Sequence, residues 1–273
     1  MAGSNRLKSA RLAGVLEREA GPPADGVSPV VHIRCFGGFT MTVDGYEPDW
    51  TSIRPKARAV LRLLSVRTGQ WLHRDRLVET FWPKLAMPSA VHNLQVAVSS
   101  LRGLLEPDRG RGEACVVVRQ GLSYRLRLPH GGSCDVTEFE RAVRDARMAR
   151  RLGRWREAAE ALCGARDAYA GPLLPEEGAS EWVVGERERL GQGAAWATDT
   201  LAELRLRQGR LGDAVETAER CLEIDPFRDS AWDTLIRAHD RSGQSAAGAR
   251  ARRRYADMLA SLGIDPATQR SSA

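Results

Sequence analysis

Residues 89–105 have the sequence SAVHNLQVAVSSLRGLL, and the interpretation of the rest of the chain depends on them. Its apolar residues recur at intervals of three and four, which is typical of a helix with one buried face. The opposite side carries amides, hydroxyls, an imidazole and one arginine, with no acidic residue before Glu106. An ordinary solvent-exposed helix face mixes charges of both signs. A face of hydrogen-bonding groups without acids favours contact with the bases and phosphates of the DNA major groove.

The polar side of this predicted helix supplies the candidate base-reading residues. Asn93 and Gln95 can bond the edge of adenine, and Arg102 can reach guanine or a phosphate. Val96 can pack on a thymine methyl group. The residues expected to contact DNA from this helix are His92, Asn93, Gln95, Val96, Ser99, Ser100 and Arg102.

Two shorter helices are predicted before this stretch. Pro55 suits a first helical turn, and the apolar stripe that follows predicts a helix that Gly69 ends. A second helix is predicted over residues 74–82, followed by a loop at residues 84–88. Arg54 and Lys56 crowd the start of the first helix, where the helix dipole disfavours cations. This placement indicates phosphate contact, although an exposed basic edge explains it equally well.

Strand patterns flank the three predicted helices. Residues 30–51 alternate between apolar and polar side chains around glycine-containing turns, which predicts a small antiparallel sheet. Residues 116–128 predict a β-hairpin with a basic outer face. The order of sheet, three helices and hairpin predicts a winged helix-turn-helix, in which the hairpin is the wing. The residues expected to hold phosphates or to reach DNA from the wing are Arg54, Lys56, Arg74, Arg119, Gln120 and Arg125.

Residues 135–266 are predicted to be helical, and a short unit recurs within them. Residues 151–162 (RLGRWREAAEAL), 207–218 (RQGRLGDAVETA) and 241–252 (RSGQSAAGARAR) align at a glycine, with a small residue five positions later. The last two units follow the tetratricopeptide period. The predicted fold class is therefore an α+β winged helix-turn-helix followed by an all-α, tetratricopeptide-like helical-repeat domain. The residues predicted to form its aromatic core are Trp155, Trp182, Trp196 and Trp232.

The distribution of charge separates the two halves of the chain. Residues 1–130 hold 19 basic and 11 acidic residues, a net charge of +8, whereas residues 131–273 hold 22 and 24, a net charge of −2. A basic half joined to a near-neutral half favours one domain that binds a polyanion and one with another role. We predict a flexible tail at 1–29, a DNA-binding domain at 30–130, a helical domain at 131–268 and a disordered tail at 269–273.

No sequence pattern favours an enzyme, a cofactor site or a metal site. The common nucleotide-binding, zinc-protease and serine-hydrolase signatures are missing from the sequence, and the five histidines share no ligand pattern. The five cysteines lack metal-ligand spacing and are expected to remain thiols in a reducing cytosol. Neither a signal peptide nor a membrane-spanning segment is expected, so we predict a cytoplasmic, nucleoid-associated protein.

Residues 30–128 resemble the winged-helix domain of the OmpR/PhoB type. The matching residues are PKARAVLRLL, the Trp82-Pro83 pair, NLQVAVSSLR and QGLSYRL. The continuation resembles the bacterial transcriptional activator domain, and the combination is similar to the Streptomyces antibiotic regulatory protein (SARP) family. The resemblance implies a homodimer that binds direct repeats in double-stranded DNA and recruits RNA polymerase holoenzyme to promoters of an antibiotic gene cluster.

The chain departs from the family pattern at two places. The family usually has arginine where Ser100 and Gly103 stand, which weakens the expected phosphate contacts or alters the preferred sequence. The family loop between the second and third helices is usually acidic, whereas residues 83–88 read PKLAMP. The possible polymerase-contact residues in this loop are Lys84, Leu85 and Met87.

Three other functions remain open from the sequence. A repressor would bind DNA without stimulating transcription. A ligand-responsive regulator would change its melting temperature with a small molecule. A helical-repeat scaffold would lack salt-dependent DNA affinity.

Overall fold

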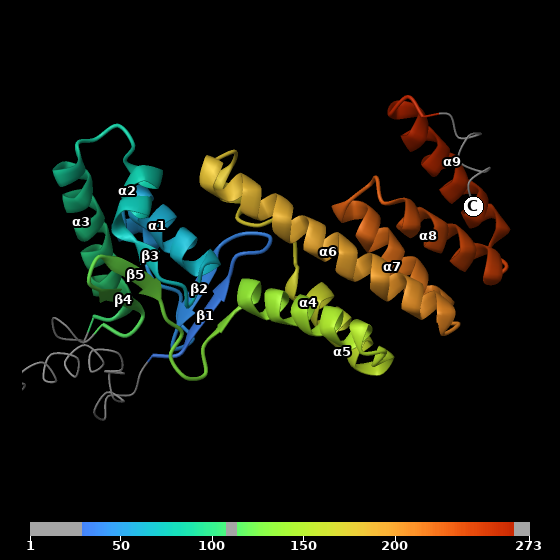
Figure 1. The fold of residues 1–273 in the computed structure, drawn as a ribbon, viewed down its shortest axis with the longest axis horizontal. Coiled ribbons are helices and arrows are strands. Elements are labelled where there is room, and N and C mark those ends of the chain that lie inside the picture. The colour runs from blue at the N-terminus through green and yellow to red at the C-terminus, as the bar shows by residue number, and fades with distance from the viewer. Residues whose placement is uncertain (1–28, 108–113, 265–273) are drawn as a thin grey trace, which may run out of the picture.

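The computed structural model describes residues 29–107 and 114–264, and it forms an elongated molecule (Figure 1). Two small sheets and three helices lie at one end, and further helices extend from them to the other end. The predicted disordered tail at 269–273, nearly all of the predicted N-terminal tail and the charged loop at 108–113 lie outside the described residues.

The first sheet begins the winged-helix region. Strands β1 (Val31–Arg34) and β2 (Thr40–Val43) pair antiparallel, as predicted, and β1 alternates between buried and exposed side chains. A third strand, β6 (Ser133–Cys134), runs parallel to β1. The sequence pattern does not predict β6, because two residues cannot show a period. The expectation of strands up to residue 51 is wrong beyond β2, since the Asp49 side chain caps a short 3-10 helix, η1 (Trp50–Ser52).

The structure confirms the three helices and the hairpin of the winged helix-turn-helix. The third helix starts two residues earlier than predicted, because Pro88 fits its first turn. The second sheet has the strand order β3-β5-β4, and the two-residue strand β3 was not predicted. The elements are α1 (Pro55–Val66), β3 (Leu72–His73), α2 (Arg74–Phe81), α3 (Met87–Leu105), β4 (Val117–Gln120) and β5 (Ser123–Leu126).

The remaining helices form antiparallel pairs that stack along the molecule (Figure 1). The aligned glycines Gly153, Gly209 and Gly243 form the turns within the pairs, each with φ between +70° and +75°. The small residues five positions later are buried, which lets paired helices approach closely. The helices are α4 (Asp135–Arg151), α5 (Trp155–Ala168), α6 (Glu181–Arg207), α7 (Leu211–Ile224), α8 (Asp229–Arg241) and α9 (Ser245–Ser261).

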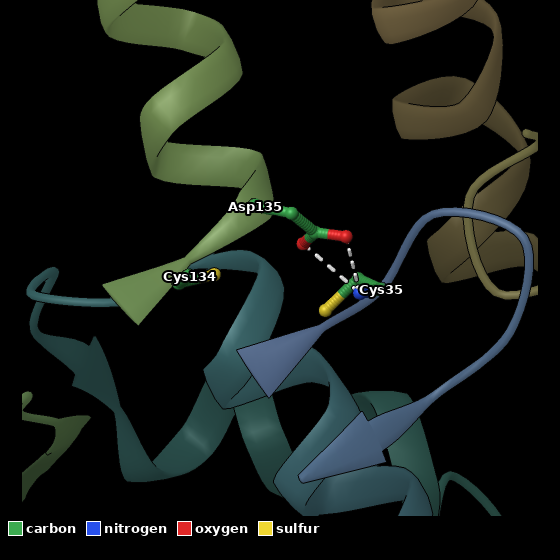
Figure 2. Close-up of side chains that lie close together, drawn as sticks. All are labelled: Cys35, Cys134 and Asp135. Carbon is green, nitrogen blue, oxygen red and sulfur yellow. Dashed lines mark hydrogen bonds between the residues drawn. The ribbon is translucent and has the colours of Figure 1, made fainter. Parts of the chain in front are cut away.

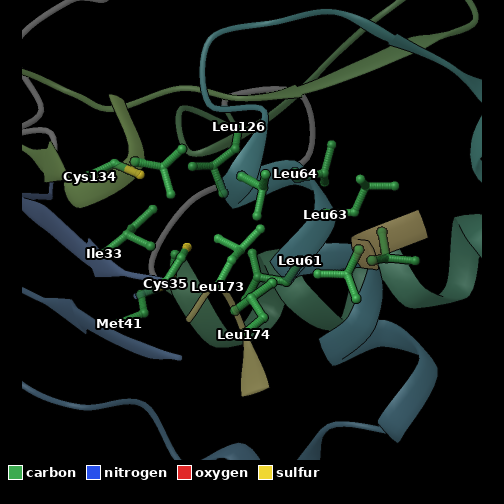
Figure 3. Packing of buried hydrophobic residues seen from close by; sticks show 14 of the residues in the cluster. Ile33, Cys35, Met41, Leu61, Leu63, Leu64, Leu126, Cys134, Leu173 and Leu174 are labelled. Carbon is green, nitrogen blue, oxygen red and sulfur yellow. The ribbon is translucent and has the colours of Figure 1, made fainter. Parts of the chain in front are cut away.

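The winged-helix region and the helical region share one hydrophobic core. Leu173 and Leu174, between α5 and α6, lie beside Ile33 and Leu61 of the winged-helix region (Figure 3). Leu173 also forms an isolated β-bridge with Phe36. Apolar burial across this junction therefore stabilises both regions together.

Ion pairs at the edge of this core join α1 to the helical region. Arg62 Nη1 lies 2.6 Å from Glu177 Oε1, in the short 3-10 helix η2 (Pro175–Glu177). Arg67, just after α1, pairs with Glu186 of α6. These side chains are mostly buried, so the pairs are less screened by salt than surface pairs.

Trp155 is an exception to the predicted aromatic core. Its exposed fraction is 49 %, because it is the first residue of α5 and lies at the end of a helix pair. Trp232 is buried, whereas Trp182 and Trp196 pack partly buried against the core. Within the described residues, no helix has both the length and the apolar character required to cross a membrane.

Candidate nucleic-acid interface

The apolar stripe of α3 anchors this helix to the core, as its periodicity predicts. The stripe leaves the opposite face of α3 exposed at the end of the molecule farthest from α9 (Figure 1). The buried members of the stripe are Ala90, Leu94, Ala97, Val98, Leu101 and Leu105.

Four of the expected base-reading residues project from the exposed face of α3. His92, Gln95 and Ser99 are exposed, and Val96 has 37 % of its surface accessible. These side chains are one turn or less apart, so they form one continuous strip along the helix. We call them the reading face. The reading face contains no acidic residue, which suits a polyanion.

The other expected contacts of α3 lie at the sides of the reading face. Asn93 is half-buried, and the Ser100 hydroxyl donates to the carbonyl oxygen of Val96 at 3.0 Å. Arg102, which was expected to contact DNA, is bonded within the protein: its Nε donates to the carbonyl oxygen of Val117 on β4 at 2.8 Å. The Arg102 guanidinium therefore links α3 to the wing.

A buried carboxylate reinforces this link between α3 and the wing. Glu106 follows α3, and its oxygens accept the backbone N–H groups of Cys115, Val116 and Val117 at 2.7–3.3 Å. These bonds satisfy amides that would otherwise be costly to bury. Arg102 and Glu106 together fix the position of the wing relative to the reading face, a role that helical periodicity cannot reveal.

The wing presents two of its expected contact residues at its tip. Arg119 and Gln120 are exposed at the end of β4, and Arg119 Nε donates to the Gly121 carbonyl at 2.9 Å. The guanidinium of Arg119 also lies over the ring of Tyr124. Arg125, by contrast, is half-buried, with its guanidinium 4.4 Å from the ring centroid of Trp71.

Some of the side chains expected to contact phosphates from α1 and α2 are free to do so, whereas others are already bonded within the protein. Arg54 is exposed, and its side chain has no hydrogen-bond or ion-pair partner within the described residues. Lys56 Nζ donates to the Phe81 carbonyl at 2.6 Å and lies over the ring of Trp82, so it caps α2. Arg74 Nε is 2.9 Å from an Asp75 carboxylate oxygen.

The structure adds one connection and one residue that sequence reasoning missed. The backbone N–H of Arg74 donates to the Leu122 carbonyl at 2.8 Å, which brings the start of α2 beside the wing tip. Arg76 is exposed on α2 and its side chain has no partner among the described residues. Because Arg76 is only two residues from the predicted phosphate contact Arg74, the sequence could have suggested it as a further contact.

The predicted polymerase-contact loop is exposed on the surface. Lys84 is exposed, and Leu85 and Met87 each have 45 % of their surface accessible. Met87 belongs to the first turn of α3 rather than to the loop.

A separate cluster lies where β1 and β6 meet the start of α4 (Figure 2). The thiols of Cys35 and Cys134 and the carboxylate of Asp135 lie within 4.8 Å of one another. The Asp135 oxygens already accept backbone N–H groups from Cys35, Phe36 and Val136 at 2.8–2.9 Å. Burial raises the pKa of Asp135 despite these hydrogen bonds. The carboxylate therefore has little capacity left for a metal ion.

Two family profiles match the two regions of the chain. The profile for the bacterial transcriptional activator domain covers residues 134–272. The profile for the C-terminal part of transcriptional regulatory proteins covers residues 49–126. Both profiles describe parts of transcriptional regulators.

Curated relatives have the same combination over most of this chain. Transcriptional regulatory protein MoaR1 of Mycobacterium tuberculosis is 28 % identical over 214 residues, which cover 78 % of this chain and 68 % of MoaR1. Transcriptional regulatory protein EmbR of the same species is 29 % identical over 233 residues, 85 % of this chain and 59 % of EmbR. Regulatory protein AfsR of Streptomyces coelicolor is 27 % identical over 216 residues, 78 % of this chain and 21 % of AfsR.

A solved structure supports the fold. The structure of M. tuberculosis EmbR in complex with a low-affinity phosphopeptide matches with a TM-score of 0.71 and 28 % identity. The match covers 88 % of this chain and 62 % of the EmbR chain. This chain belongs to the bacterial transcriptional activator domain family, and with its OmpR-type winged helix it is a DNA-binding transcriptional regulator of the SARP and EmbR type.

Proposed function

We propose that this protein is a transcriptional activator that reads promoter DNA in the cytoplasm, at the nucleoid. Two copies bind tandem direct repeats and recruit RNA polymerase holoenzyme to the genes of a secondary-metabolite cluster. The observation that carries the proposal is the acid-free reading face of α3, held to the wing by Arg102 and Glu106. The choice of gene cluster rests on the resemblance of the sequence to the Streptomyces antibiotic regulatory protein family.

Base recognition falls to the reading face in this proposal. Gln95 can form two hydrogen bonds with adenine, and Val96 can pack on a thymine methyl group. His92 and Ser99 flank them and can bond further base edges or phosphates. Asn93 is half-buried and the exposed Ser100 hydroxyl is bonded to the Val96 carbonyl, so these two residues reach DNA only at the border of the contact. A good bidentate contact contributes roughly 1–3 kcal/mol of discrimination between bases.

Phosphate contacts supply most of the affinity and set the register on the duplex. Arg54 and Arg76 have no competing acid within the described residues, so they are the strongest candidates. Arg119 and Gln120 extend the contact to a flanking groove. Arg74 must exchange or share its bond with Asp75 in order to reach a phosphate.

The exposed segment before α3 is the proposed polymerase surface. Leu85 and Met87 expose apolar surface beside the cation of Lys84. A partner protein that covers this segment would bury its apolar surface, which favours association. Because this segment precedes the reading face, a protein bound there lies close to the DNA.

The first test is binding of the full chain to the promoter DNA that flanks its own gene, measured across a salt series. We expect tight binding that weakens steeply with salt, and Gln95→Ala should weaken it roughly 5–150-fold. Gln208→Ala is the matched control, because Gln208 is an exposed glutamine at the end of α6. Binding that Gln95→Ala leaves unchanged would place the reading face elsewhere.

In-vitro transcription from the same promoter tests activation separately. We expect the protein to raise transcript yield, and we expect Leu85→Ala with Met87→Ala to remove the stimulation while DNA binding persists. DNA binding without stimulation would indicate a repressor. Stimulation that depends on a small molecule would indicate a ligand-responsive regulator. The absence of DNA binding at every salt concentration would leave the helical region as a protein scaffold.

A further inference from the structure

Two buried thiols meet at the junction between the winged-helix region and the helical region. Cys35 follows β1, and Cys134 lies in β6, immediately before α4 (Figure 2). Both residues are fully buried, and their sulfur atoms lie within 4.8 Å of each other. They are 99 positions apart in the sequence and come together only because β6 pairs with β1.

The surroundings give the two thiols different acidities. A hydrogen bond with Cys134, together with burial, raises the pKa of the Cys35 thiol. The same hydrogen bond lowers the pKa of the Cys134 thiol, against the effect of burial. Cys134 is also the N-cap residue of α4, where the helix dipole favours a thiolate. Cys134 is therefore the more nucleophilic thiol of the pair.

Asp135 holds the pair in register. Its carboxylate accepts the backbone N–H groups of Cys35 and Phe36, which fixes the end of β1 against the first turn of α4. Because these bonds occupy the carboxylate, the chemistry left to the cluster is that of two adjacent thiols. A disulfide has a sulfur–sulfur distance of about 2.05 Å, so oxidation brings together two sulfur atoms that already lie within 4.8 Å of each other.

We propose that Cys35 and Cys134 form a redox-active dithiol, which hydrogen peroxide oxidises to a disulfide between β1 and the start of α4. The Cys134 sulfur attacks one peroxide oxygen, the O–O bond breaks, and Cys134 sulfenic acid and water form. The Cys35 sulfur then attacks the Cys134 sulfur, the S–O bond breaks, and a second water leaves. The thiol pair loses two electrons and two protons, and peroxide is reduced to water.

The position of β6 explains both how peroxide reaches the two thiols and what the disulfide changes. This strand lies at the edge of its sheet and has only two residues, so a local separation of β6 from β1 exposes both sulfurs. The Cys134 thiol donates to the Ser65 carbonyl of α1 at 3.6 Å, and the disulfide removes this donor. The oxidised chain carries a covalent link between the DNA-binding region and the helical region.

The test uses the full reduced chain, exposed to hydrogen peroxide and then alkylated under denaturing conditions. Tryptic cleavage yields a peptide of residues 35–56 that contains Cys35 and a peptide of residues 128–141 that contains Cys134. The first peptide extends past Arg54 because the Arg54-Pro55 bond resists cleavage. We expect a non-reducing digest to contain these two peptides joined and lighter by two hydrogens, and a dithiol reductant to separate them. Thiols that both remain alkylatable after peroxide has oxidised the partly exposed Cys163 would overturn the proposal.

Single substitutions assign the two roles. In Cys35→Ser we expect Cys134 to stop at the sulfenic acid, which dimedone labels. In Cys134→Ser we expect oxidation of Cys35 to slow at least tenfold. Cys163→Ser is the control and should form the Cys35–Cys134 link at the rate of the unmodified chain. Unchanged oxidation of Cys35 in Cys134→Ser would contradict the assignment, and the digest of the unmodified chain tests the link even if a variant fails to fold.

Discussion

Arg102 Nε donates a hydrogen bond to the carbonyl oxygen of Val117, 2.8 Å away, and so joins α3 to the first strand of the wing. The bond connects the two elements that are proposed to enter DNA. Arg102 is half-buried, so part of its side chain is packed against the protein. Its removal therefore affects folding as well as any contact with DNA.

We expect Arg102→Ala to lower the free energy of unfolding by about 1–3 kcal/mol, because a charge-assisted hydrogen bond to a buried carbonyl is lost. Urea denaturation measures this change. Ser99→Ala, on the exposed face of the same helix, should change the free energy of unfolding by less than about 0.5 kcal/mol. An Arg102→Ala protein of unchanged stability that no longer binds DNA would show that Arg102 acts on the DNA directly.

Arg54 and Lys56 are two residues apart but should behave differently. The Arg54 side chain has no partner within the described residues, so Arg54→Ala should reduce the slope of log affinity against log salt by about 0.9 if it contacts one phosphate. Lys56 caps α2 through the Phe81 carbonyl, so Lys56→Ala should cost about 1 kcal/mol of stability and leave the slope unchanged. Equal changes in slope for both variants would argue against this division.

Gly209 and Gly212 provide a matched pair in the helical region. Gly209 has a φ of +75° in the turn before α7, whereas Gly212 lies inside α7 with no atom within 4 Å of an added Cβ. We expect Gly209→Ala to lower the free energy of unfolding by about 1–2 kcal/mol, and Gly212→Ala to raise it by about 0.5–1 kcal/mol. Thermal denaturation of both variants should show melting temperatures displaced in opposite directions.

Asp199 should make stability depend on pH. Burial raises the pKa of Asp199 above its ordinary value of 3.8, against a hydrogen bond from Ser230. The folded chain therefore holds this proton more tightly than the unfolded chain, so ionisation of Asp199 reduces stability. Relative to Asp199→Asn, the unmodified chain should lose free energy of unfolding as pH rises from 3.8 through the raised pKa, and the difference should then stay constant.

Urea denaturation of the two proteins at a series of pH values checks this prediction. Asparagine retains an oxygen that can accept the Ser230 hydrogen bond, so the comparison isolates the charge. A difference that does not vary with pH, or that favours the unmodified chain at higher pH, would contradict a raised pKa.

Local sequence patterns predict most of the helices and strands of this chain. The amphipathic period of residues 89–105 predicts both α3 and its buried stripe, and alternation predicts β1, β2 and the wing. The aligned glycines predict the turns of the helical pairs. β3 and β6 escaped prediction because a strand of two residues has no period and forms only where a partner strand passes.

The candidate site was predictable only where it depends on local helical periodicity. Helical geometry alone placed Gln95, Val96 and Ser99 on one exposed face. It could not show that Arg102 binds the Val117 carbonyl or that Lys56 caps α2, because those acceptors are 15 and 25 residues away. A basic residue beside a predicted interface is free or engaged depending on which distant carbonyl lies within reach.

The order of elements, the apolar faces and the unequal charge of the two halves can be read from the amino-acid sequence, because they depend on short-range backbone geometry and on composition. The folded structure was needed to show which polar side chains remain available to DNA, how Leu173 and Leu174 join the two regions, and that Cys35 and Cys134 are neighbours. These features arise from contacts between distant segments, where strand pairing and packing of the shared core, rather than sequence spacing, determine which atoms meet.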